Sequence, residues 1–137
     1  MPIAFTVRHH NHRVSAVGWI DVTLSDFMQY VRARIASDIA DFDQLLDLRR
    51  ALLQFDRDEI LSWIMAEHGA LGNRPCGRIA VVSTGGTTPE TVARTMQAEL
   101  NKAGTECEVF FDWADAEDWL SSRRASDQLP NAEGGAA

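Results

Sequence analysis

The amino-acid sequence predicts an α/β fold whose elements follow the order β-β-α-β-α-β-α-β-α. Two observations lead to this prediction. Short segments with strand-like apolar patterns are separated by longer segments that carry an apolar stripe at helical spacing. Each helical segment also joins two successive strands, and such connections produce parallel neighbours. We therefore expect a mostly parallel, five-stranded sheet in sequential order, with the first strand antiparallel at one edge and the helices mainly on one face.

The first two strands are expected to form a hairpin. Residues 3–8 alternate apolar and polar side chains, and residues 13–17 form a second apolar run that stops at Gly18. The polar residues 9–12 between them have the composition of a short connection.

Three helices are expected to begin at recognisable caps. Thr23 is followed by Asp26 and Asp56 by Glu59, each at the spacing of an N-cap and its partner. Pro89 suits the first turn of the third helix. The buried stripes are expected to be Leu24, Phe27, Met28, Val31 and Ile35, then Ile60, Leu61, Ile64 and Met65, then Val92, Met96 and Leu100. Gly69 and Gly104 are expected to end the second and third helices.

The remaining strands are expected at residues 42–48, 78–83 and 107–111. The middle one is apolar on both faces, which indicates a central strand. A short closing helix over residues 114–120 is expected to be anchored by Trp113, Ala116, Trp119 and Leu120. These elements place one domain at residues 1–122, and the small, polar residues 123–137 are expected to form a flexible tail.

Composition excludes several classes of protein. Thirteen Lys and Arg against 20 Asp and Glu give a formal net charge of −7, which disfavours binding to nucleic acid or to anionic membranes. No apolar run approaches the roughly 20 residues of a membrane-spanning helix. Two cysteines, Cys76 and Cys107, are too few for a disulfide framework, so we expect a cytoplasmic protein with reduced, buried thiols.

Three segments resemble the STAS, or SpoIIAA-like, family of anti-sigma-factor antagonists. They are residues 42–49, residues 78–82, and residues 109–112 followed by Ala116, Trp119 and Leu120. The late strand, acidic turn and closing helix that ends in Trp-Leu are similar to bacterial SpoIIAA-like proteins of unassigned role. The resemblance extends over about residues 3–121, and it implies a sheet in sequential order with helices mainly on one side.

One position departs from the pattern of the phospho-regulated members. Those proteins carry a Ser or Thr after an Asp and an apolar residue, whereas Asp47 and Leu48 are followed here by Arg49. A guanidinium cannot accept a phosphoryl group. The partner switch driven by phosphorylation is therefore not expected in this chain.

The main candidate site lies where the fourth strand leads into the third helix. Glycines let a backbone approach a ligand, and free N–H groups at a helix start favour anions. Asp47 and Arg49 end the neighbouring strand, so we expect them beside this loop, where Arg49 would bind a carboxylate or phosphate. The alternative is a local Asp47–Arg49 ion pair beside a simple helix cap. The loop consists of Thr84, Gly85, Gly86, Thr87 and Thr88.

Other polar groups receive structural interpretations. His9, His10 and His12 cluster in the hairpin connection, and we expect a solvated turn there rather than a metal site. His68 precedes the helix-ending Gly69 and is expected to interact with the helix dipole. Spacing brings together no nucleophile and base. We therefore expect no catalytic residue, no metal and no cofactor.

The sequence leaves two functions open. The first is a non-enzymatic, regulatory STAS-like module that docks onto another protein or forms a homodimer, through an uncovered sheet face carrying Leu45 and Phe110. Trp19 is a further candidate for an exposed contact surface. The second is a sensor of small anionic ligands at residues 84–88 with Arg49.

Overall fold

The computed structural model describes residues 3–53 and 55–122. Its strands form one sheet in the order β1-β2-β3-β4-β5. β1 pairs antiparallel with β2, and every other neighbouring pair is parallel. The predicted order and the mixed pairing are thus confirmed. The strands are β1 (Ile3–Arg8), β2 (Arg13–Val22), β3 (Asp43–Leu53), β4 (Ile79–Val82) and β5 (Cys107–Phe110).

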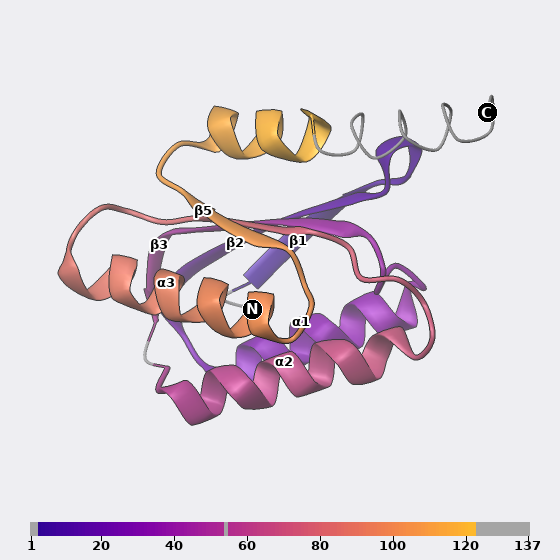
Figure 1. Cartoon of the computed structure of the whole chain (residues 1–137), viewed down its shortest axis with the longest axis horizontal. Coiled ribbons are helices and arrows are strands. Elements are labelled where there is room, and N and C mark those ends of the chain that lie inside the picture. Colours follow the sequence, from indigo (N-terminus) through magenta and orange to yellow (C-terminus); the bar gives the residue numbers. More distant parts are fainter. Residues whose placement is uncertain (1–2, 54, 123–137) are drawn as a thin grey trace.

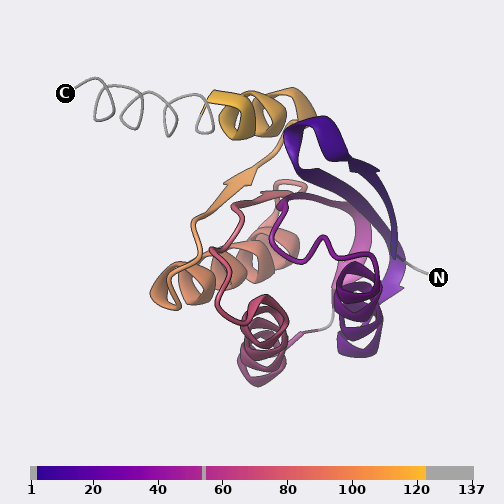
Figure 2. The same cartoon turned by 90° about the vertical axis from the view of Figure 1, so that its right-hand side faces the viewer.

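Helices cover both faces of the sheet unequally. α1 (Leu24–Ala36), α2 (Arg57–Leu71) and α3 (Thr87–Lys102) lie on one face, which we call the inner face (Figure 1). A closing helix over residues 113–122 lies on the opposite, outer face (Figure 2). The expected closing helix and its anchors are confirmed, because Ala116 and Leu120 are fully buried. No helix among the described residues combines the length and apolar character that a membrane crossing requires.

The outer face corrects one expectation. Leu45 and Phe110 were expected on an uncovered face, yet Leu45 is 0% exposed and packs with Ala116 and Leu120. Phe110 packs against Trp119 with ring centroids 5.6 Å apart. The closing helix thus removes from solvent the surface that was expected to promote self-association. The larger core lies on the inner face and includes Val14, Phe27, Leu46, Ile60, Trp63, Val81, Met96 and Leu100.

The predicted helix starts are confirmed in atomic detail. The Thr23 hydroxyl accepts the amide N–H of Asp26, and the Asp26 carboxylate accepts the amide N–H of Thr23 at 2.9 Å. Asp56 and Glu59 form the same reciprocal pair at 2.8 and 3.2 Å. Each pair satisfies two backbone donors that the first helical turn leaves free. These local signals fix where α1 and α2 begin.

The buried stripes of α1 and α2 are rotated from those expected. Ile35 is 49% exposed and Met65 is 74% exposed, although both were expected in the core. Arg34 and Glu67 occupy the buried positions instead. The reason is an ion pair between these two side chains, described below. α2 also continues past Gly69 and ends at Leu71, with Gly72 as its C-cap.

β2 and β3 are longer than expected. β2 continues through Gly18, where β3 contains one residue more than β2 between the paired positions. A β-carbon at Gly18 would lie 3.2 Å from Leu48 and 3.3 Å from Val22, so glycine lets these side chains pack closely. Within the described residues, β1 pairs with β2 as far as Gly18, and β4 pairs with β3 as far as Asp47. Residues 19–22 and 50–53 therefore project beyond the neighbouring strands, and we call them the β2–β3 extension.

The two edges of the sheet differ in how their backbone groups are satisfied. On β5, the N–H of Cys107 donates to Oδ1 of Asn101 at 2.9 Å. The Cys107 carbonyl accepts from the side-chain amides of Gln97 and Asn101, each at 3.3 Å. α3 thus occupies groups that another strand would bind. In the described part of the chain, no side chain caps the backbone of β1 in this way.

Gly77, which precedes β4, provides a test of this packing. A β-carbon there would lie 2.3 Å from the carbonyl oxygen of Phe42, a backbone atom that cannot move aside cheaply. We expect Gly77→Ala to lower the free energy of unfolding by about 2 kcal/mol or more, as overpacking does. Gly69→Ala is the matched control, because a β-carbon at Gly69 meets nothing within 4 Å. It should raise stability by about 0.5–1 kcal/mol through helix propensity. Urea denaturation measures both variants, and equal effects would contradict this account.

Candidate functional site

Asp47 and Arg49 form a local ion pair, which was the alternative interpretation. Nε of Arg49 donates to Oδ1 of Asp47 at 2.9 Å, and Nη2 donates to Oδ2 at 2.8 Å. The backbone N–H of Arg49 also donates to Oδ1 at 3.2 Å. Asp47 is the last residue of β3 that pairs with β4. Its carboxylate therefore satisfies the strand backbone at the point where the neighbouring strand stops.

This pairing sets the charge of Asp47. Burial of the carboxyl acts to raise its pKa, but the hydrogen bonds from the Arg49 guanidinium and backbone outweigh burial and hold the pKa below its ordinary value. The pKa of Arg49 is raised, first by its hydrogen bonds to Asp47. In the described part of the chain, the hydrogen bonds that the Arg49 guanidinium donates all end on Asp47.

The predicted loop follows β4 as expected. Thr84, Gly85 and Gly86 are exposed, and Gly86 is the N-cap of α3 with φ +129°, a conformation that favours glycine. No side chain caps this helix start. Thr87 and Thr88 begin α3, and their side chains lie outside the described part of the structure. Asp47 and Arg49 lie on the sheet face that Leu45 shares, because side chains alternate along a strand.

The histidines and cysteines also have defined surroundings. The rings of His9 and His12 meet Phe42 edge-on, with centroids 5.7 and 5.1 Å apart. Nε2 of His68 lies 3.1 Å from the Thr105 hydroxyl. Among the described residues, no three His, Cys, Asp or Glu side chains are grouped to hold a metal ion.

One of the two thiols differs from expectation. Cys107 is buried, and burial raises its pKa to about 12, so the thiol stays protonated. Cys76 is exposed, whereas both were expected to be buried. It lies in the connection between α2 and β4, which contains Pro75 and Gly77 and forms no regular structure. The sequence of this connection has no periodic pattern of apolar residues, so it gives no reason to expect a buried thiol at Cys76.

A row of charges that the sequence analysis missed crosses the amino ends of the parallel strands. Arg13 is paired in register with Asp43, and Asp43 binds the amide and guanidinium of Arg78 at 2.9 and 3.2 Å. All three are at least nine-tenths buried. Arg13 also binds the closing helix, through Glu117 at 3.3 Å and Ser121 at 3.1 Å. The missed signal is a charged residue at or just before the start of each of these strands.

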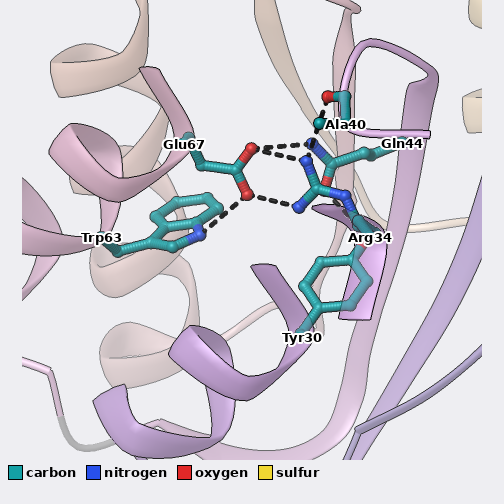
Figure 3. Close-up of polar contacts among 6 residues, drawn as sticks. All are labelled: Tyr30, Arg34, Ala40, Gln44, Trp63 and Glu67. Atoms are coloured by element: carbon teal, nitrogen blue, oxygen red, sulfur yellow. Dashed lines mark hydrogen bonds and ion pairs between the residues drawn. The ribbon is translucent and has the colours of Figure 1, made fainter. Parts of the chain in front are cut away.

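A second missed cluster lies in the core between α1, α2 and β3 (Figure 3). Nη1 and Nη2 of Arg34 donate to the two carboxylate oxygens of Glu67 at 2.5 and 2.7 Å. Side chains of Gln44 and Trp63 donate to the same carboxylate, at 3.3 and 3.2 Å. The Tyr30 hydroxyl donates to Gln44 at 2.8 Å. The Arg34 side chain is 0% exposed and the Glu67 side chain is 6% exposed, so this pair is almost fully removed from water.

The pKa values of Arg34 and Tyr30 are both raised within the core cluster. Burial alone would lower the pKa of Arg34, but its interactions with Tyr30 and Glu67 outweigh this effect and raise the pKa. Burial has the opposite effect on a phenol, and it raises the pKa of Tyr30 far above its ordinary value. Both carboxylate oxygens of Glu67 accept hydrogen bonds from neighbouring side chains. We conclude that this cluster orients α1 and α2 rather than receiving a ligand.

We expect removal of one member of the buried pair to be costly. Glu67→Gln leaves the Arg34 charge buried without its counterion, so the free energy of unfolding should fall by about 3–5 kcal/mol. Arg34→Met combined with Glu67→Leu should cost less than the two single changes added together, because no charge is left unpaired. The control is Glu90→Gln at the exposed Glu90–Arg94 pair, where the loss should stay within about 1 kcal/mol. Urea denaturation measures each variant, and strict additivity would contradict the coupling.

The Asp47–Arg49 pair should contribute to stability in a pH-dependent way. The pKa of the Asp47 carboxyl is lower in the folded state than in the unfolded state. The stabilisation by the pair is therefore fully present above the unfolded pKa of about 3.9, and it is lost as pH falls through the lower folded pKa. Asp47→Asn should therefore be less stable than the wild type at pH 7, by about 1 kcal/mol or less because Arg49 is partly exposed. The difference should vanish in strong acid. Arg49→Gln should show the same convergence, and a difference that persists in acid would refute this assignment.

No family model and no curated protein matches this sequence. Among solved structures, the chain is similar to the crystal structure of an uncharacterised DUF3478-family protein with a SpoIIAA-like fold from Shewanella loihica PV-4. The TM-score is 0.58 at 17% sequence identity, over 86% of this chain and 93% of that one. At this identity the likeness concerns the fold alone. The chain therefore has a SpoIIAA-like fold, as the resemblance of its sequence implied.

Proposed function

We propose that this chain is a non-enzymatic, SpoIIAA-like regulatory module that acts by docking onto proteins, in the first instance onto a second copy of itself. The observation that supports this proposal is the β2–β3 extension. Trp19, Ile20 and Leu52 are 36%, 66% and 63% exposed there. Large apolar side chains gathered at one end of a sheet are typical of a contact surface.

The backbone of the extension supports the same interpretation. Ile20 adopts φ +61°, in the left-handed region that β-branched residues rarely occupy. Such a conformation costs on the order of 1–3 kcal/mol and is found most often at functional positions. Here it accompanies an apolar side chain that stays in solvent. Among residues 3–53 and 55–122, the extension also lies past the last residues that pair with β1 and β4, which would leave backbone groups for a partner.

The sensor function has weaker support. The N-terminus of α3 carries no side-chain cap, which favours an anion. However, Asp47 accepts two of the guanidinium hydrogen bonds of Arg49 and neutralises its charge. An anion would have to compete with this bidentate carboxylate for Arg49, so we place docking first.

Sedimentation velocity at increasing protein concentration tests the docking function. We expect a reversible dimer, and we expect Ile20→Gly to raise its dissociation constant at least tenfold, or about 1.4 kcal/mol. Glycine tolerates the positive φ, so this variant should not lose stability as a monomer. Leu52→Ser should also weaken the dimer. Met65→Ser is the matched control, because it removes an equally exposed apolar side chain from α2. A wild-type monomer at high micromolar concentration, or equal effects of all three changes, would refute the proposal.

A further inference from the structure

A groove on the outer face of the hairpin lies beside the closing helix. Its volume is about 250 Å³. The closing helix runs next to β2 and leaves β1 uncovered, since Ala4, Thr6 and Arg8 are all exposed. The groove involves Ser15 and Val17 of β2, whereas the β2–β3 extension begins at Trp19, so the two surfaces share no residue. Its lining comes from Ala4, Thr6 and Arg8 of β1, Ser15 and Val17 of β2, and Trp113 of the closing helix.

One end of the groove is apolar. Ala4 and Val17 are register partners in the hairpin, and both are small enough to leave an open floor. Trp113, the first residue of the closing helix, also lines the groove. An indole beside aliphatic side chains offers a large apolar contact area. This end would take a hydrocarbon group.

The other end of the groove carries positive charge. Nη1 of Arg8 lies 3.5 Å from Oε2 of Glu117, and the same oxygen accepts Nη1 of Arg13 at 3.3 Å. One carboxylate oxygen thus faces two guanidinium groups. Arg8 holds the longer of the two contacts, and its side chain is 51% exposed. An incoming anion can therefore reach Arg8 without breaking a buried pair, and a carboxylate suits its planar donors.

The middle of the groove contains a hydroxyl without a protein partner. Oγ of Ser15 is buried and makes no hydrogen bond within the described residues. Ser15 is paired in register with Thr6, which is exposed. A buried polar atom left without a partner is costly, so a rotation of the Ser15 side chain that brings Oγ to a ligand oxygen in the groove would be favoured.

We infer that this groove binds a small carboxylic acid with an unbranched or aromatic hydrocarbon body. The carboxylate contacts Arg8 and approaches Ser15, and the hydrocarbon lies along Ala4 and Val17 against Trp113. Binding here does not depend on the docking function, because the two surfaces share no residue.

Titration of the ¹⁵N-labelled chain with octanoate, followed by NMR, tests this inference. We expect saturable shifts of the Ala4, Thr6 and Val17 amides and of the Trp113 indole N–H. Octanol has the hydrocarbon without the carboxylate, and acetate has the carboxylate without the hydrocarbon. Both should bind at least tenfold more weakly than octanoate. Octanol binding as tightly as octanoate would overturn the role of Arg8, and acetate binding as tightly would overturn the role of the apolar end.

Two variants complete the test. Arg8→Gln should raise the octanoate dissociation constant at least tenfold and leave octanol binding unchanged. Arg32→Gln changes an exposed arginine on α1, away from the groove and from the β2–β3 extension, and should alter neither. Shifts that centre on other residues, no shifts at millimolar octanoate, or equal loss in both variants would overturn the inference. Sedimentation of the same samples shows separately whether the chain dimerises, so the two proposals can fail independently.

Discussion

The buried ion pair between Arg34 and Glu67 is the constraint on which the inner layer depends. Both side chains lie on the sheet-facing sides of their helices, and neither can turn outward without leaving a charge unpaired in the core. The pair therefore fixes the rotation of α1 and α2 about their axes. Gln44 extends the network to β3, so helices and sheet share one set of hydrogen bonds. Apolar packing fills the remaining space around this arrangement.

Local signals in the sequence were sufficient for the order of elements and for the helix starts. The Thr23–Asp26 and Asp56–Glu59 pairs are contacts between residues three apart, which a linear reading can find. The rotation of the helices depends on the contact between Arg34 and Glu67, which are 33 residues apart, and local sequence patterns do not reveal such a contact. One signal was available: residues 60, 63, 64, 67 and 71 have regular helical spacing only if Glu67 is accepted as buried.

In the candidate sites, too, contacts between chain neighbours could be predicted and contacts between distant residues could not. The alternative interpretation of Asp47 and Arg49 anticipated their pairing, because the two residues are neighbours in the chain. The groove beside Trp113 could not be predicted from the sequence. It is formed by residues about a hundred positions apart, which the placement of the closing helix brings together. That helix also covers Leu45, so its position determines which apolar surface remains available. The length of β2 was underestimated because Gly18, which permits close packing, looks in sequence like the end of a strand.

The asymmetry between the sheet edges bears on how far assembly could proceed. Asn101 and Gln97 occupy the outward groups of Cys107, so β5 is a poor template for an additional strand. A molecule with only one receptive edge can join another through that edge once. Growth by sheet extension would then close at a pair related by two-fold symmetry and would not continue into a fibre. Two side chains on α3 would thereby hinder the addition of strands at the β5 edge.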